Sequence, residues 1–163
     1  FEARPTLNKA YVESNVMIAM RDGVRLACDI YRPAKSGNPI EGKFQVLLSS
    51  TPYSKTRADL ARDAEFFASQ GYVSVLQDCR GRYESGGGFT KYVGEGEDGF
   101  DTMAWISRQD WFGGKIGTYG LSYSAHTQAA AACLNPPNLA CMWLDSGGFS
   151  NAFLNACRNG GAF

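Results

Sequence analysis

The sequence predicts an α/β fold in which a single domain is built on a mostly parallel sheet. Short apolar runs of strand length alternate along the chain with segments whose apolar residues repeat at helical spacing. With 163 residues, of which 44% are hydrophobic, the chain can bury the core of about one ordinary domain. Parallel neighbours in a sheet need crossover connections, so we expect helices on both faces of the sheet.

The first predicted element is an antiparallel hairpin. Its strands are the apolar-rich runs 16–20 and 24–31, and Asp22-Gly23 between them is a strong signal for a hairpin turn. Residues 32–42 contain two prolines and two glycines and should form a loop. This loop leads into a predicted strand over 44–50.

Alternating helices and strands follow the hairpin. In the segment 57–70, Leu60, Ala64 and Ala68 fall on one face of a helix, and Gly71 supplies the stop. The remaining predicted elements are a strand over 72–76, a glycine-rich loop over 79–96, a helix over about 97–109, a strand over 115–119, a helix over 122–134 and a strand over 139–144.

Composition excludes several classes of function. Lys plus Arg and Asp plus Glu both number 16, so no field of a single sign favours nucleic acid or an anionic membrane. No apolar run approaches the ~20 residues that cross a bilayer, and no secretion signal opens the chain. We expect a soluble domain, either cytoplasmic or exported after removal of a leader, and its oligomeric state stays open.

Cysteines and clustered acidic residues receive structural interpretations. The five cysteines, at 28, 79, 133, 141 and 157, show no Cys-x-x-Cys pair, which argues against a disulfide framework or a zinc site. We expect most of them to be small core residues, and a bridge between Cys133 and Cys141 stays open. Acidic side chains at 95, 97, 98 and 101 are expected to stabilise a helix start.

The segment Gly120-Leu121-Ser122-Tyr123-Ser124 lies between a predicted strand and a predicted helix, where a Gly-x-Ser-x-Gly nucleophile elbow belongs. An elbow needs small residues two positions before and after the serine, because strand and helix pass closely. Gly120 and Ser124 are both small. The turn would expose the Ser122 hydroxyl beside the amide hydrogens of a helix N-terminus. The alternative is that Ser122 only caps the helix.

His126 is the only histidine in the sequence and lies one helical turn beyond Ser122. A triad base meets the serine hydroxyl from the open side of the site, whereas a residue on this buried helix is held on the flank. The chain order of α/β-hydrolases also places the acid and then the histidine on later loops. We therefore expect His126 to be a packed, hydrogen-bonded residue and not the base.

Further motifs occur in order between Val16 and Gly148. They are Met20-Arg21-Asp22-Gly23-Val24, Asp29-Ile30-Tyr31-Arg32-Pro33, Thr51-Pro52-Tyr53-Ser54-Lys55, Gly71-Tyr72, Gln77-Asp78-Cys79-Arg80-Gly81-Arg82 with Ser85-Gly86, Glu97-Asp98-Gly99-Phe100-Asp101-Thr102 and Gly120-Leu121-Ser122-Tyr123. Together they resemble the CocE/NonD serine hydrolases, the group of cocaine esterase, α-amino acid ester hydrolase and X-Pro dipeptidyl-peptidase.

This resemblance implies an α/β-hydrolase core that is incomplete at its C-terminus. Residues 1–163 would be the N-terminal part of the catalytic domain, without the helical cap and C-terminal β-sandwich of the family. Ser122 matches the family nucleophile, and the Tyr53 hydroxyl and the Tyr123 backbone N–H match the two donors of the oxyanion hole. The triad Asp and His would lie beyond residue 163, so Asp145 is assigned no catalytic role.

The predicted function is hydrolysis of ester or amide bonds through an acyl-enzyme on Ser122, with no metal or organic cofactor. The substrate class, whether small-molecule ester, β-lactam-type amide or Xaa-Pro peptide, stays open. The 163 residues alone are expected to be inactive. The alternative is a non-catalytic binding or scaffold domain that retains the hydrolase core.

Overall fold

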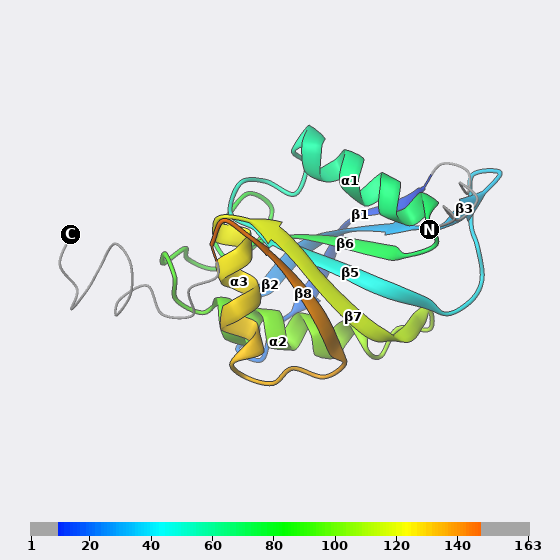
Figure 1. Cartoon of the computed structure of the whole chain (residues 1–163). Coiled ribbons are helices and arrows are strands. Elements are labelled where there is room, and N and C mark those ends of the chain that lie inside the picture. The colour runs from blue at the N-terminus through cyan, green and yellow to red at the C-terminus, as the bar shows by residue number, and fades with distance from the viewer. Residues whose placement is uncertain (1–9, 148–163) are drawn as a thin grey trace.

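The computed structural model describes residues 10–147, which form a six-stranded mixed sheet with helices on both faces (Figure 1). The sheet has the order β1-β2-β6-β5-β7-β8. Its strands are β1 Tyr11–Ala19, β2 Arg25–Arg32, β5 Phe44–Thr51, β6 Val73–Asp78, β7 Phe112–Leu121 and β8 Leu139–Asp145. The pairs β6/β5, β5/β7 and β7/β8 are parallel, whereas β1/β2 and β2/β6 are antiparallel. The predicted α/β fold, with its N-terminal hairpin, is confirmed.

The hairpin turn forms at Asp22-Gly23. Met20 and Val24 close it with a main-chain hydrogen bond of 2.8 Å, and the Asp22 carboxylate accepts the Val24 N–H at 3.1 Å. Gly23 has φ +84°, a conformation that glycine adopts without steric cost. Strand β1 carries a bulge near Asn15, where the pairing register with β2 shifts.

Three helices cover the sheet, α1 Ala58–Ser69 on one face and α2 Glu95–Ile106 and α3 Tyr123–Ala132 on the other (Figure 1). Ala64 and Ala68 of α1 are fully buried with Leu76 and Tyr31 beneath them, as the predicted helical face requires. The larger core lies on the side of α2 and α3. It contains Ile18, Leu26, Ile30, Val46, Val73, Val75, Met103, Ile106, Trp111 and Ile116, among others.

Strand β7 begins three residues before the predicted 115–119 strand and ends two residues after it. Its opening Phe112-Gly113-Gly114 has the composition of a turn, but Phe112 pairs with Phe44 of β5. A Cβ on Gly113 would lie 2.7 Å from the Phe44 carbonyl, so glycine allows the two backbones to meet there. The loop 32–42 likewise contains a small pairing, between β3 Ala34–Lys35 and β4 Asn38–Pro39.

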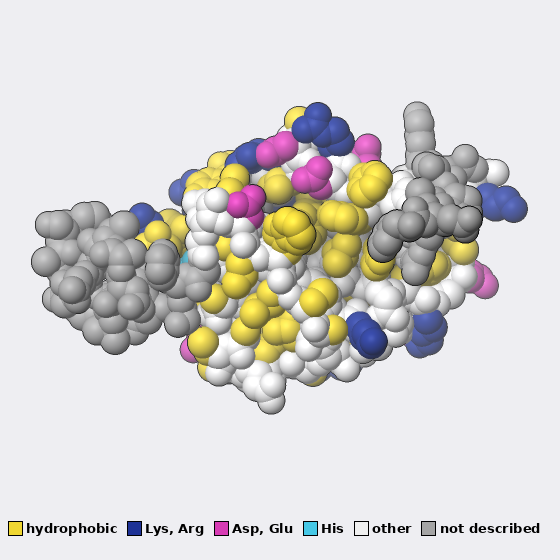
Figure 2. Space-filling view, viewed as in Figure 1, with side chains coloured by type: hydrophobic (Ala, Val, Ile, Leu, Met, Phe, Trp, Pro, Cys, Tyr) yellow, Lys and Arg dark blue, Asp and Glu magenta, His cyan; other side chains and the backbone are white. Residues whose placement is uncertain are grey.

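Strand β8 is the edge of the sheet and is exposed along most of its length. Trp143 is 72% exposed, and its neighbours Met142 and Leu144 are also exposed. Figure 2 shows hydrophobic side chains gathered on the side of the molecule where β7 and β8 lie in Figure 1.

The described cysteines are all free, with Cys28 and Cys79 buried and Cys133 and Cys141 exposed. The structure therefore contains no bridge between Cys133 and Cys141, and Cys157 lies outside the described residues.

Between residues 10 and 147, no group of three or more His, Cys, Asp or Glu side chains is arranged to hold a metal ion. None of the helices in this part of the chain has the length and apolarity needed to span a membrane.

Candidate active site

Ser122 forms a sharp turn between β7 and α3. Its backbone has φ 59° and ψ −114°, a combination that residues with a side chain seldom adopt and that marks local strain. Ser122 is exposed, and although it occupies the N-cap position of α3, its side chain makes no capping hydrogen bond. Capping therefore does not account for this serine, and its hydroxyl is available at the carboxyl end of β7.

The residues on either side of the turn are packed against each other. A Cβ added to Gly120 would lie 2.4 Å from the Cβ of Ser124, so position 120 accepts only glycine without rearrangement. Ser124 occupies the position where many elbows carry glycine, and the close approach of strand and helix persists with its small side chain buried.

The first turn of α3 directs amide hydrogens toward the elbow. As the first residue of this helix, Tyr123 carries a backbone N–H with no acceptor within the helix. The positive end of the helix dipole also favours negative charge at this position. An oxyanion formed at Ser122 would meet a favourable field.

Tyr53 lines a cleft of about 300 Å³ together with residues that flank Ser122 in the elbow, whereas Ser122 and Tyr123 themselves are not among the residues that line it. Tyr53 follows the carboxyl end of β5 and is 41% exposed, with the guanidinium carbon of Arg57 5.8 Å from its ring centroid. The other walls come from the elbow, from the ends of β5 and β8 and from α1. They include Thr51, Asp59, Leu60, Asp63, Tyr119, Gly120, Leu121, Ser124, Trp143 and Asp145. The structure thus brings two distant predicted site segments together.

Three hydrogen bonds hold the loop that carries Tyr53, and each of them involves a main-chain group. The Thr51 carbonyl oxygen accepts from the Cys79 N–H at 2.9 Å, and the Thr51 hydroxyl accepts from the Tyr53 N–H at 3.0 Å. The Pro52 carbonyl oxygen accepts from the Arg82 guanidinium at 3.0 Å. Arg82 belongs to the glycine-rich loop after β6, so this loop supports the site structurally.

A buried network supports α3 from below. The Tyr123 hydroxyl donates to the Glu95 carboxylate and accepts the Tyr92 N–H at 2.7 Å, and the Tyr92 ring stacks on that of Tyr123 at 4.9 Å. Burial is the main cause that raises the pKa of Tyr123 well above its usual value, and the hydrogen bond to Glu95 raises it further. The phenol therefore stays protonated and anchors the start of the helix that follows Ser122.

His126 lies in this network. It is 4% exposed, its ring packs edge-on against Tyr92 at 4.7 Å, and its Nε2 lies 4.0 Å from a Glu95 carboxylate oxygen. This position matches the expectation of a packed histidine on the flank of the elbow.

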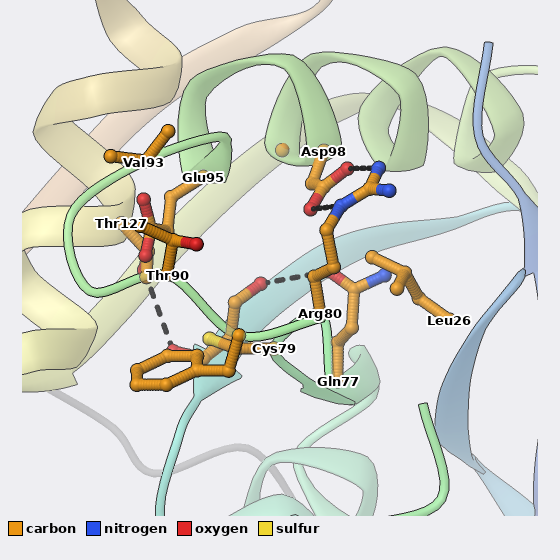
Figure 3. A pocket seen from close by; sticks show the side chains of 12 residues that line it. Leu26, Gln77, Cys79, Arg80, Thr90, Val93, Glu95, Asp98 and Thr127 are labelled. Atoms are coloured by element: carbon orange, nitrogen blue, oxygen red, sulfur yellow. Dashed lines mark hydrogen bonds and ion pairs between the residues drawn. The ribbon is translucent and has the colours of Figure 1, made fainter. Parts of the chain in front are cut away.

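A second, smaller cavity of about 20 Å³ lies beside the same network (Figure 3). Arg80 and Asp98 face each other on one side of it, with hydrogen bonds of 3.0 and 2.6 Å, and Glu95 and Thr127 lie on the other side. Its volume suits about one water molecule. We assign it a structural role.

The sequence-based interpretation of the acidic cluster is incomplete. Glu95 and Asp98 are buried and bind the specific partners Tyr123 and Arg80, and Asp101 binds Arg21 in the hairpin turn. These carboxylates do lie in the first two turns of α2, as expected. Their main contacts, however, join α2 to α3, to the loop after β6 and to the hairpin, which composition at a helix start does not reveal.

The sheet order, the helices on both faces and the strained serine after a central parallel strand define the fold class, an α/β-hydrolase core. Residues 22–163 match the sequence profile of the X-Pro dipeptidyl-peptidase (S15) family, and the chain belongs to that family. It is 42% identical over 125 residues to cocaine esterase from Rhodococcus sp. (strain MB1 Bresler), an alignment that covers 74% of this chain and 21% of that protein.

Solved structures agree with the family. An α-amino acid ester hydrolase superposes with a TM-score of 0.74 at 29% identity, covering 98% of this chain and 29% of that one. A CocE/NonD family hydrolase from Staphylococcus aureus superposes with a TM-score of 0.67 at 32% identity, covering 80% and 26%. The chain thus spans between about a fifth and a third of the length of these relatives. Two of these relatives are named as hydrolases and the third as an esterase.

Proposed function

We propose that this chain is the N-terminal part of the catalytic domain of a serine hydrolase, with Ser122 as nucleophile. The observation that carries the proposal is the strained elbow at Ser122, whose exposed hydroxyl makes no capping bond and whose neighbours share a cleft with Tyr53. Backbone strain of this kind persists where function requires a side chain to be presented in one direction.

The proposed reaction begins with attack of the Ser122 hydroxyl oxygen on the carbonyl carbon of an ester or amide. A base takes the hydroxyl proton as the new C–O bond forms, and the carbonyl oxygen becomes an oxyanion. The Tyr53 hydroxyl and the Tyr123 N–H would donate to this oxyanion. Collapse expels the alcohol or amine with the proton, and water then releases the acid from the acyl-enzyme.

We place the triad Asp and His on a longer polypeptide, beyond residue 163. His126 is buried and packs beside Glu95 and Tyr92, whereas a triad base meets the serine hydroxyl from the open side of the site, so we do not assign His126 as the base. The share of the relatives that this chain covers supports the same assignment, because most of their length lies outside the alignment.

The proposed substrates are compounds with an acyl group that can be transferred to water. The family description names an X-Pro dipeptidyl-peptidase, and the relatives are named as a cocaine esterase and an α-amino acid ester hydrolase. These names share acyl transfer from an ester or amide, and we propose that chemistry for this protein. The mechanism requires no metal or organic cofactor.

A covalent label tests the proposal. The full-length protein that contains this chain is treated with a fluorophosphonate, and mass spectrometry locates the adduct. We expect one adduct on Ser122, and none in Ser122→Ala. If Ser122 stays unmodified while the protein is folded, the proposal fails, and a non-catalytic scaffold with a hydrolase core becomes the better description.

A further inference from the structure

We infer that Lys55 is a positioning residue, which holds the Tyr53 hydroxyl in place through a buried ion pair with Asp29. The inference rests on the proposed function, since it assigns a role to the loop that would supply one oxyanion donor. Lys55 lies two residues after Tyr53, in the connection between β5 and α1.

The Tyr53 loop needs such an anchor because its backbone is strained and its tyrosine is poorly covered. Ser54, between Tyr53 and Lys55, has φ 79°, which lies in the left-handed region that favours glycine. Strained backbone of this kind persists only where surrounding contacts fix it. The Tyr53 ring is 41% exposed, so packing alone holds it weakly.

Lys55 is the largest fully buried side chain among the described residues, with 1% of it exposed. Its ammonium lies 2.9 Å from the Asp29 carboxylate and donates to the Asn15 side-chain oxygen at 2.8 Å. Burial of a charge is costly unless it is paired and hydrogen-bonded, and both conditions are met here. Such a lysine has a single low-energy position.

The partners of Lys55 belong to the hairpin, so the anchor crosses part of the sheet. Asp29 lies in β2 and Asn15 at the bulge of β1, whereas Tyr53 follows β5, and β6 lies between β2 and β5. Asn15 has φ 54°, and its backbone N–H donates to the Asp29 carboxylate at 2.9 Å. The bulge therefore shapes both groups around the ammonium.

The backbone of Lys55 is fixed as well. Its N–H donates to the Asp78 carboxylate at 2.7 Å, at the carboxyl end of β6. Lys55 thus ties the strained loop to β6 by its main chain and to β1 and β2 by its side chain. Loss of the ion pair would let the strain at Ser54 relax and the Tyr53 hydroxyl move away from the oxyanion.

The test uses the full-length protein that contains this chain and p-nitrophenyl acetate as the ester. Replacing only Lys55 would leave Asp29 as an unpaired buried charge, so the variant is the neutral pair Lys55→Met with Asp29→Asn. We expect kcat to fall about 10- to 100-fold with KM unchanged, the size of effect that misplacement of a catalytic group produces.

Combination with Tyr53→Phe separates positioning from general stability. If Lys55 acts through the Tyr53 hydroxyl, the neutral pair will lower kcat in the wild-type background but cause no further loss in Tyr53→Phe. Equal losses in both backgrounds would overturn the inference, as would wild-type kcat in the neutral pair. The matched control is Arg21→Met with Asp101→Asn, which removes an ion pair between the hairpin turn and α2 and should leave kcat unchanged.

A second readout needs no turnover. Hydrogen exchange of residues 51–56, followed by mass spectrometry, should rise in the neutral Lys55 pair and not in the Arg21 control. Unchanged exchange would contradict the inference independently of chemistry. Failure of the proposed function has a different signature, because the wild-type protein would then take no fluorophosphonate at Ser122 and hydrolyse the ester no faster than Ser122→Ala.

Discussion

The backbone N–H of Ser122 donates a hydrogen bond of 2.8 Å to the carbonyl oxygen of Asp145, which ends β8. Leu121 pairs with this same residue in the parallel register of β7 and β8. A Cβ on Gly147 would lie 2.5 Å from the Ser122 carbonyl oxygen, so the chain after β8 also passes directly against the elbow. The geometry of the proposed nucleophile thus depends on the edge strand.

Strain at Ser122 predicts an unusual pair of variants. Both Ser122→Gly and Ser122→Ala should abolish ester hydrolysis, because both lack the hydroxyl. Ser122→Gly should nevertheless be the more stable of the two by about 1–3 kcal/mol, since glycine accepts a positive φ and alanine does not. Thermal unfolding of the two variants measures this difference. Equal stability would show that the elbow is unstrained.

Gly120→Ala should impair folding, because the added methyl group would lie 2.4 Å from the Ser124 Cβ. Overpacking of this kind typically costs about 1–3 kcal/mol. Adding Ser124→Gly should restore only part of the loss, because it removes the nearest atom but leaves φ +156° at residue 120 and the main-chain carbonyl of residue 124 at 3.2 Å. Gly88→Ala is the matched control, since nothing lies within 4 Å of a Cβ there. Midpoints of thermal unfolding rank the variants, and an unaffected Gly120→Ala would contradict the close approach.

Tyr123→Phe separates the side chain of this residue from its backbone donor. The variant leaves the buried Glu95 carboxylate and the Tyr92 N–H without the hydroxyl that joins them, which should cost about 1–3 kcal/mol of stability. The backbone N–H of residue 123 remains, so kcat for p-nitrophenyl acetate should change little. By contrast, Tyr53→Phe should lower kcat about 100- to 1000-fold without loss of stability. Similar kcat losses in both would contradict the assigned roles.

Tyr119 should make the protein sensitive to alkaline pH. Burial raises the pKa of Tyr119 to about 12, from an ordinary value near 10. The unfolded chain therefore loses this proton more readily than the folded one, so the stabilising contribution is complete below pH ~10 and declines up to pH ~12. Thermal unfolding across this range should show a smaller decline in Tyr119→Phe.

The control for that experiment is Phe67→Leu. The Phe67 ring packs edge-on against the Tyr119 ring, with 5.2 Å between the ring centroids. This variant should lower stability by a similar amount at every pH, because neither phenylalanine nor leucine titrates and Tyr119 keeps its hydroxyl. A decline that is as steep in Tyr119→Phe as in the wild type would assign the pH dependence to other groups.

The 163-residue chain alone should hydrolyse p-nitrophenyl acetate no faster than its Ser122→Ala variant. The proposed base and acid belong to a longer polypeptide, and the buried His126 should not replace them. Turnover by the 163-residue chain that disappears in His126→Ala would instead identify His126 as the base.

Local patterns were sufficient to predict the hairpin, the three helices and the sharp turn at Ser122, but not the small β3/β4 pairing or the first residues of β1 and β7. Asp22-Gly23 specifies its turn through its own backbone, and small residues around Ser122 specify the close approach of β7 and α3. The motif was sufficient to identify Tyr53 as a candidate site residue, but it did not predict the buried ion pair that holds the Tyr53 loop. Lys55 and Asp29 lie 26 residues apart, and their pairing across β6 depends on a sheet order that no local pattern encodes.

The contacts of the acidic residues of α2 could not be predicted for the same reason, because their partners are distant in the sequence. A carboxylate in the first turn of a helix is favoured by the dipole whether or not it has a partner. Glu95 instead binds the buried phenol of Tyr123, and Asp98 binds the guanidinium of Arg80. Both partners come from other segments of the chain. The sequence shows that a carboxylate lies near the start of the helix, and only the packed fold shows which side chain it binds.

The two exposed faces and open border of β8 have a practical consequence for biochemistry. Within residues 10–147, β8 has a neighbouring strand on one side only and presents Trp143 to solvent, and such an edge is a template for pairing with another polypeptide. Preparations of the isolated 163-residue chain should therefore self-associate at high concentration, and Met142→Lys, at an exposed position of β8 outside the lining of the cleft, is the simplest remedy to try.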